Sequence, residues 1–368
     1  MSKFTICICG GGNLAHVVGG YIASKDRYEV RLFTRHPERW QEDRTITVTD
    51  CNGKVFNARF SIITKDPEKA VKGADIVLLC LPGFAIASTL QTIKPYLDQT
   101  THVGSVVSST GFFLMAKNIL SVNTGLFGLQ RVPFIARTKS YGKTAELLGY
   151  KSSLSFAVHN IKDTSCLEKT LNDLFDTPLI LLDNYLKVTL TNSNPLLHPS
   201  RLYGMFSSQK ESYDSPIRFY EDWDDFSSET LIACDNEFGK LLEKLDITRK
   251  DIPSILDYYE STDASSLTRK IKSIDAFKGL LAPMIQTSHG TYKPDFSNRY
   301  FTEDFPYGIL IIKCFAQINN ISTPTIDSII EWEQKCVCKE YIREGQTIGK
   351  DLKETIAPYI IDICKNGN

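Results

Sequence analysis

The sequence lacks both an excess of positive charge and a hydrophobic run of membrane-spanning length. Its 42 Lys and Arg residues stand against 43 Asp and Glu residues, so no overall positive field exists to bind a nucleic acid by releasing its counterions. The most apolar stretch, residues 76–88, contains Pro82 and Gly83 and is shorter than the roughly 20 residues that a transmembrane helix needs. We therefore expect neither a nucleic acid nor a membrane as a partner.

Paired cysteines and a secretory leader are also missing. None of the ten cysteines belongs to a C-x-x-C motif, so the sequence predicts neither a metal site nor a disulfide framework. Cys7, Cys9 and Cys80 lie within apolar runs, where a free thiol behaves as a small hydrophobic group. The first residues show no charged head, long apolar middle and cleavage site of a signal peptide. These features favour a cytoplasmic protein.

The first half of the chain has the pattern of an α/β domain. Short β-rich runs occur at residues 4–9, 29–33, 76–81 and 102–107. They alternate with helical patterns, as in a doubly wound parallel sheet. Two more β-rich runs flank Asn52-Gly53, a strong signal for a tight hairpin. We expect this hairpin at the edge of the sheet.

The second half has a different pattern of apolar residues. After residues 179–182, the last strand that we expect, long amphipathic patterns replace the short apolar runs, as in residues 231–245, 326–337 and 352–364. Their apolar positions recur at helical spacing. The length of 368 residues agrees with two domains at about 150 residues each. We place an α/β domain at residues 1–186 and a mainly α-helical domain at residues 187–368.

A glycine-rich motif follows the first strand directly. Gly10-Gly11-Gly12-Asn13-Leu14-Ala15 matches the G-x-G-x-x-A fingerprint and opens a helical pattern. In such a motif the first glycine permits a tight turn, the second lets the backbone approach a pyrophosphate, and the small last residue allows the helix to pack on the strand. The motif predicts a Rossmann domain with a dinucleotide site, the alternative being a flexible turn without a ligand.

The end of the second strand bears on the choice between NAD and NADP. An NAD site usually has an Asp or Glu there, whereas this chain has Thr34-Arg35. A guanidinium can bind a 2′-phosphate with two hydrogen bonds, so we prefer NADP to NAD, unless Arg35 is only a solvated surface side chain. Leu81-Pro82, which follows a later strand, lies where an open α/β sheet places its ligands.

His198 has the most specific setting of the six histidines. Because Pro199 suits the first position of a helix, we expect His198 to cap a helix that begins there. A histidine held rigidly at the start of a helix suits an acid or base, although a histidine that only caps the helix or packs in the core is the alternative. Among the carboxylates of the charged segment 294–308, Asp304 is the best partner for His198, because it directly precedes an apolar helical run. Arg299 in the same segment is suited to bind a substrate carboxylate.

Four segments together resemble, in order and separation, the opine dehydrogenases of the octopine dehydrogenase type. They are residues 10–13, 131–137, 194–199 and 294–308. The most specific part is Asn298-Arg299-Tyr300-x-Thr302-Glu303-Asp304-x-Pro306. The resemblance implies a Rossmann domain followed by a helical domain. It also implies an enzyme that joins the amine of an amino acid to a 2-oxo acid, such as pyruvate, and reduces the imine with NADH or NADPH.

The same resemblance assigns roles to individual residues. His198 and Asp304 take the positions of the family's catalytic dyad, and Arg299 that of an arginine at the substrate site. Two substrate carboxylates call for cations, and Arg137 is a second candidate besides Arg299. Asn194 and Thr110 are candidates for hydrogen bonds to the oxo acid. Thr34-Arg35, Thr110 and residues 132–136 differ from the animal octopine enzymes, which leaves the substrate pair open, and the oligomeric state is open as well, a homodimer included.

Two other functions compete with this interpretation. The first is a 2-oxo acid reductase of the ketopantoate reductase type, which has a similar N-terminal half but relies on a lysine rather than a His/Asp dyad; turnover without an amine would select it. The second is a nicotinamide-binding sensor without turnover. The presence of His198, Arg299 and Asp304 together argues against the sensor, because binding alone requires none of them.

Overall fold

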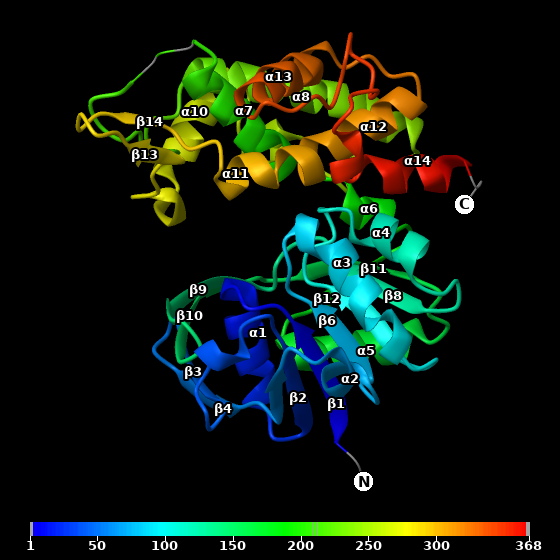
Figure 1. Ribbon diagram of the computed structural model, residues 1–368. Coiled ribbons are helices and arrows are strands. Elements are labelled where there is room, and N and C mark those ends of the chain that lie inside the picture. The colour runs from blue at the N-terminus through cyan, green and yellow to red at the C-terminus, as the bar shows by residue number, and fades with distance from the viewer. Residues whose placement is uncertain (1–2, 209, 211, 366–368) are drawn as a thin grey trace. The chain divides into compact units, whose positions relative to one another are not determined.

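The computed structural model describes residues 3–208, 210 and 212–365 (Figure 1). The chain divides into two compact units, Met1–Thr189 and Leu190–Asn368. The division follows residue 189, three residues after the boundary that we placed from the sequence. Each unit is described by itself below.

Unit 1 is built on a doubly wound sheet of eight strands in the order β12-β11-β8-β7-β6-β1-β2-β5, which confirms the predicted fold class. Neighbouring strands are parallel except for β8 and β11. The strands are β1 (Phe4–Cys9), β2 (Tyr28–Phe33), β5 (Ile62–Thr64), β6 (Ile76–Leu79), β7 (His102–Ser105), β8 (Gly125–Leu129), β11 (Leu154–His159) and β12 (Leu179–Leu182). The helices are α1 (Asn13–Ala23), α2 (Pro67–Val71), α3 (Gly83–Ile93), α4 (Phe112–Ile119), α5 (Thr164–Phe175) and α6 (Leu186–Thr189).

The central strands are apolar throughout because both faces of the sheet are covered. All four residues of β6 are buried, as are the five residues after Phe4 in β1, which is typical of a parallel sheet between layers of helices. Helix α1 buries Ala15, Val17 and Ile22. This packing fixes the N-terminal end of α1 beside the C-terminal end of β1, where the glycine-rich motif lies.

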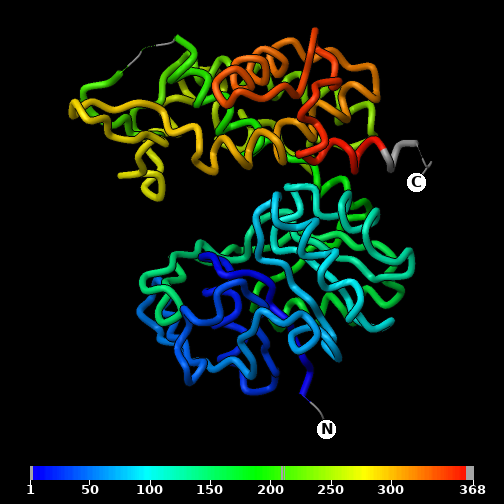
Figure 2. The backbone as a smooth tube through the Cα atoms, in the orientation of Figure 1, coloured from blue at the N-terminus to red at the C-terminus, as the bar shows by residue number. Residues whose placement is uncertain are grey.

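A second sheet of four strands, in the order β4-β3-β10-β9, also belongs to unit 1. It contains β3 (Thr45–Asp50), β4 (Val55–Arg59), β9 (Phe134–Ser140) and β10 (Thr144–Tyr150). The predicted hairpin around Asn52-Gly53 forms, but its expected position at the edge of the main sheet is wrong. β3 pairs instead with β10 from much later in the chain, as the adjoining blue and green hairpins show in Figure 2. One face of β3 is buried, and Val48 lies against Gly20 of α1, so packing on α1 holds the hairpin away from the main sheet.

Unit 2 is mainly helical. Its elements are α7 (Asn194–Phe206), α8 (Asp225–Lys244), α9 (Ile255–Tyr258), α10 (Ala264–Ser273), β13 (Met284–Gln286), β14 (Tyr292–Pro294), α11 (Arg299–Thr302), α12 (Leu310–Ile318), α13 (Pro324–Cys336) and α14 (Ala357–Lys365). The helices expected around residues 231–245 and 326–337 are present as α8 and α13. The single helix expected over residues 352–364 is wrong: a 3-10 turn covers Leu352–Glu354, and α14 begins only at Ala357. Pro358 explains the late start, because proline is tolerated in the first turn of a helix but not in its interior. Within the described part of the chain, no helix has the length and apolar character required to cross a membrane.

A buried carboxyl in α13 gives a testable pH dependence. Glu333 is fully buried, and neither of its carboxyl oxygens has a hydrogen-bond partner among the described residues. Burial raises the pKa of Glu333 well above its usual value. Between the ordinary pKa and this raised one, the unfolded chain loses a proton that the folded chain keeps, so stability falls as pH rises.

The Glu333→Gln variant should lack this contribution. As pH rises above the ordinary pKa of a glutamate, the free energy of unfolding of the wild type should fall relative to that of the variant by up to about 1.4 kcal/mol per pH unit. Urea denaturation of both proteins at several pH values measures the difference. Parallel pH profiles would mean that Glu333 ionises in the folded protein.

Candidate active site

The glycine-rich loop leaves its backbone accessible at Gly12. Gly10 has a φ of +145°, and a Cβ atom built there would lie 2.6 Å from the carbonyl oxygen of Cys80. A Cβ atom on Gly12 would meet nothing within 4 Å. α1 begins directly after Gly12, with Asn13 exposed, Leu14 half-buried and Ala15 buried. The loop therefore fits a pyrophosphate group, which a helix N-terminus attracts.

The end of β2 lies beside this loop, as the sequence predicts. Thr34 is buried, and its hydroxyl oxygen lies 2.9 Å from the position of a Cβ atom on Gly11. Arg35 is exposed. A hydroxyl and a cation thus stand where an NAD-specific site usually has a carboxylate.

The buried side chain of His16 stabilises the glycine-rich loop by hydrogen bonds. These contacts were not predicted from the sequence. The Nδ1–H of His16 donates to the Gly12 carbonyl over 2.9 Å, and its Nε2 accepts from the Gly142 N–H over 2.8 Å. Burial lowers the pKa of His16, which favours the neutral ring that these two roles require. Asn13 makes a second link, because its side-chain oxygen accepts from the Thr138 N–H over 2.9 Å. The contact between His16 and Gly12 could have been predicted from their spacing, because residues four apart at the start of a helix lie on the same face.

Tyr141, in the turn between β9 and β10, was also missed. Its hydroxyl lies 2.6 Å from the position of a Cβ atom on Gly11, and the guanidinium of Arg39 lies 3.8 Å from the centre of its ring. Nothing in the sequence joins residue 141 to the glycine-rich motif, because the contact depends on how the second sheet packs against α1.

The remaining predicted residues of unit 1 lie at strand ends or on the second sheet. Leu81 and Pro82 are half-buried between β6 and α3. Thr110 lies between β7 and α4, and its hydroxyl oxygen is buried without a hydrogen-bond partner among the described residues. Because β6 and β7 are parallel neighbours, these two loops leave the same edge of the sheet, where such folds bind ligands. Arg137 is exposed on β9, next to the Thr138 that binds Asn13.

Unit 2 brings His198 and Asp304 together. The Nδ1 atom of His198 lies 2.8 Å from Oδ2 of Asp304, and the side chains are only 8% and 13% exposed. The prediction that His198 caps a helix is wrong, because α7 begins at Asn194 and contains both His198 and Pro199. Pro195, at the second residue of α7, is the proline that marks the helix start. His198 therefore projects from the interior of a helix.

Asp304 reaches His198 from an irregular helical segment. It precedes a π-helical turn, Phe305–Ile309, in which the Ile309 N–H donates to the Asp304 carbonyl over 2.8 Å. Turns of this type are frequent at functional sites. Asp304 is half-buried in this position.

Asn194 lies on the helix that carries His198, and Arg299 lies on the short helix that precedes Asp304. The Arg299 side chain is 71% exposed and lies 3.5 Å from the carboxylate of Glu303. Arg299 is the first residue of α11. This helix ends at Thr302, and Glu303 separates it from Asp304. Asn194 is exposed and lies one turn before His198 on α7, so both side chains share a helix face.

Aromatic side chains surround the dyad. The ring of Tyr300 meets that of His198 edge-on at 4.5 Å, and Phe219 does so at 5.6 Å. The hydroxyl of Tyr220 lies 3.1 Å from Nε2 of His198. Tyr220 was missed from the sequence, since no motif surrounds it. Both nitrogens of His198 thus have partners.

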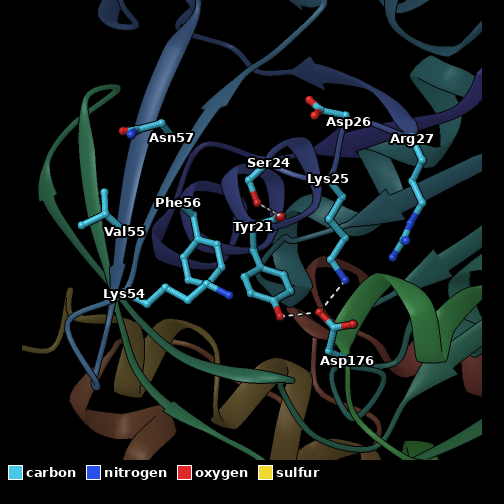
Figure 3. Close-up of a pocket in the computed structure, with 10 residues that line it drawn as sticks. All are labelled: Tyr21, Ser24, Lys25, Asp26, Arg27, Lys54, Val55, Phe56, Asn57 and Asp176. Atoms are coloured by element: carbon cyan, nitrogen blue, oxygen red, sulfur yellow. Dashed lines mark hydrogen bonds and ion pairs between the residues drawn. The ribbon is translucent and has the colours of Figure 1, made fainter.

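A cavity of about 670 Å³ lies elsewhere in unit 1 and contains none of the predicted site residues (Figure 3). It adjoins the C-terminal end of α1, whereas the glycine-rich loop lies at the N-terminal end. Tyr21 and Lys25 both bind Asp176 there over 2.6 Å. These contacts fix the end of α1 against the loop that follows α5. Among the described residues, no cluster of His, Cys, Asp and Glu is arranged to hold a metal ion.

Comparisons with known proteins match both units. Residues 181–337 match the model of the family described as NAD/NADP octopine/nopaline dehydrogenase, alpha-helical domain. Residues 6–109 match that of ketopantoate reductase PanE/ApbA. The chain is 32% identical to octopine dehydrogenase of Pecten maximus, over 96% of this chain and 95% of that protein. It is 30% identical to tauropine dehydrogenase of Arabella iricolor, over 96% of each protein. A solved structure of octopine dehydrogenase with NADH and L-arginine has a TM-score of 0.88 and 30% identity, and covers 100% of this chain and 98% of that one.

Proposed function

Since this chain belongs to the octopine and opine dehydrogenase family, we propose that it joins the amine of an amino acid to a 2-oxo acid and reduces the imine. It is an NAD(P)-dependent oxidoreductase that acts on CH–NH bonds. The observation that carries the proposal is the hydrogen bond of 2.8 Å between His198 and Asp304. A pure dinucleotide sensor has no use for such a pair.

We propose that His198 is the acid and base of the condensation. When the amine has attacked the oxo carbon, the resulting carbinolamine must lose its hydroxyl group as water, which requires a proton. A positioned imidazole supplies such a proton efficiently. Asp304 accepts the Nδ1–H of His198, and thereby holds one tautomer and stabilises the imidazolium. Bound NAD(P)H supplies the hydride that reduces the imine.

The remaining site residues bind the ligands in this proposal. Arg299 and Arg137 pair with substrate carboxylates, because a guanidinium matches the geometry of a carboxylate. Asn194 and Thr110 offer hydrogen bonds to the oxo acid, and the unpartnered hydroxyl of Thr110 supports such a contact. In unit 1, Gly10, Gly12, Asn13, Leu14, Ala15, Leu81 and Pro82 shape the dinucleotide site, and Thr34 and Arg35 face the adenosine ribose.

The relatives suggest which substrates to test first. Solved structures of octopine dehydrogenase contain L-arginine or pyruvate together with NADH, and another relative is a tauropine dehydrogenase. We therefore propose pyruvate as the first oxo acid. Arginine, taurine and small apolar amino acids are the first amines.

The decisive assay follows oxidation of NADPH and NADH by the purified protein with pyruvate or 2-oxoglutarate, with and without each amine. Oxidation that requires both substrates is the expected result. The match of residues 6–109 to ketopantoate reductase makes a 2-oxo acid reductase the second candidate. Oxidation with the oxo acid alone would select it, and would contradict the proposed condensation.

We propose NADP(H) as the preferred cofactor. The Arg35→Ala variant should bind NADPH about 10- to 100-fold more weakly, because it loses charged hydrogen bonds to the 2′-phosphate, whereas NADH binding should change little. Titrations followed by nicotinamide fluorescence measure both affinities. Arg59→Ala, which removes an exposed arginine from β4, is the control for a general loss of positive charge. Equal losses for NADPH and NADH would remove Arg35 from the 2′-phosphate site.

We also propose a reducing, cytoplasmic setting. Nine cysteines of the described residues carry free thiols, including the neighbours Cys7 and Cys9, whose sulfur atoms lie 3.9 Å apart. Free thiols in this number are typical of proteins that remain in a reducing compartment.

A further inference from the structure

The hydrogen bonds of His198 raise a question about how a proton reaches the substrate. Nδ1 is bound to Asp304, and Nε2 is bound to the Tyr220 hydroxyl over 3.1 Å. Only Nε2 remains to exchange a proton with a substrate, because Nδ1 is engaged by its hydrogen bond with Asp304. A substrate oxygen must therefore either displace the Tyr220 hydroxyl or exchange its proton through it.

Tyr220 is held too firmly for displacement to be easy. It is 6% exposed, and its ring stacks on that of Phe277 with the centres 4.0 Å apart. The fully buried Arg201 of α7 secures the surrounding loop, since its guanidinium donates to the carbonyls of Phe219 and Asp222 over 2.9 and 2.6 Å. The hydroxyl is thus fixed by α7, the helix that also carries His198.

We propose that Tyr220 relays a proton between Nε2 of His198 and the substrate oxygen, an inference that rests on the proposed condensation. Nε2–H of the imidazolium passes its proton to the Tyr220 oxygen while the Tyr220 O–H passes its own to the carbinolamine hydroxyl. The C–O bond breaks, water leaves with the bonding pair, and the nitrogen lone pair forms the C=N bond. The products are neutral imidazole, intact Tyr220 and an iminium ion, so protons and charge balance.

A hydroxyl group suits this position in both states of His198. It donates to Nε2 when the imidazole is neutral and accepts from Nε2–H when the ring is charged, which neither a backbone carbonyl nor an N–H can do. Burial, with Tyr300, Tyr259 and Asp304 nearby, raises the pKa of Tyr220. Tyr220 therefore keeps its proton at rest, and the two transfers are concerted rather than passing through a free phenolate.

The Tyr220→Phe variant removes the hydroxyl and keeps the ring that stacks on Phe277. We expect kcat of the condensation to fall by about 10²-fold, the low end for a lost acid–base step, because water partly replaces the relay. NAD(P)H affinity and the thermal unfolding midpoint should stay near the wild-type values. In mixtures of H₂O and D₂O, the wild-type rate should depend on deuterium content with the curvature of two protons in transit, and the variant should lose this curvature.

Tyr213→Phe is the matched control in the same unit. Its hydroxyl donates to the Met205 carbonyl over 2.9 Å, so this variant also loses one phenol hydrogen bond, but away from His198. Its kcat and its isotope dependence should equal those of the wild type. As a second measurement, difluorotyrosine at position 220 keeps the hydroxyl but makes it more acidic, and should change kcat while retaining the two-proton curvature.

These outcomes separate the relay from the proposed function. Wild-type kcat and two-proton curvature in Tyr220→Phe would overturn the relay and leave Tyr220 a packing residue, and an unchanged kcat with difluorotyrosine would do the same. If the wild-type protein itself showed no oxidation that depends on both amine and oxo acid, the proposed condensation would fail first.

Discussion

Replacing His198 with asparagine should lower kcat of the reductive condensation by about 10²- to 10⁴-fold, because the positioned acid and base is lost. NAD(P)H binding should persist, since the glycine-rich loop that we propose as the dinucleotide site lies in unit 1 and His198 in unit 2. Single-turnover kinetics measures the chemical step, and fluorescence titration measures cofactor binding. His289→Asn replaces an exposed histidine of the same unit and should leave both values unchanged.

Asp304→Asn tests whether the two residues act as a pair. An amide at 304 no longer stabilises the imidazolium, so kcat should fall and its pH profile should move toward lower pH. Its effect on kcat should be much smaller in the His198→Asn background, because groups that act as a unit are not additive. Full activity of His198→Asn would exclude His198 from the chemistry, and additive losses would separate Asp304 from His198.

The geometry of the glycine-rich loop was predictable because its signals are local. Gly10, Gly12 and Ala15 lie within six consecutive residues, and each has a role fixed by the strand before it and the helix after it. The central strands were predictable for a similar reason: burial on both faces of the sheet leaves continuous apolar runs such as Ile76–Leu79. Local sequence thus determined the main sheet and the position of its ligand loop.

The second sheet was not predictable, because it depends on pairing over a long distance. β3 and β10 join segments that are about a hundred residues apart, with Thr47 opposite Thr144. A hairpin signal gives the turn at Asn52-Gly53 but not the next strand. The contact of Tyr141 with the glycine-rich loop depends on the packing of this second sheet and was missed with it.

The dyad shows both the reach and the limit of sequence analysis. His198 and Asp304 are 106 residues apart. The place of Asp304 before an apolar helical run suggested the pair, and the resemblance to a family gave the pair its expected catalytic role. Two prolines in one segment led to the wrong helix start, since Pro195 and Pro199 each satisfy the rule for an N-terminal proline. Tyr220 belongs to a loop without a motif, and only the packing of Arg201 and Phe277 places its hydroxyl on His198.

Gly12→Ala should lose cofactor affinity, whereas Gly10→Ala should lose stability. The contrast between the two variants tests the proposed dinucleotide site directly. Gly12 has a φ of −89° and a ψ of −170°, which alanine adopts, and its Cβ atom would meet no protein atom within 4 Å. Gly12→Ala should therefore fold normally. Its methyl group would occupy the space through which the backbone approaches the pyrophosphate, an overlap that costs roughly 1–3 kcal/mol or about 10- to 100-fold in affinity.

Gly10→Ala should instead damage the protein before it damages binding. Its φ of +145° disfavours a side chain, and the new Cβ atom would lie 2.6 Å from the backbone oxygen of Cys80, which cannot move without disturbing the end of β6. We expect a lower thermal unfolding midpoint for Gly10→Ala and one near the wild-type value for Gly12→Ala, measured by circular dichroism. NADPH titration of the folded Gly12→Ala protein then decides the point. Wild-type affinity would mean that no pyrophosphate approaches Gly12, whereas weak binding by an intact fold places the cofactor against this backbone.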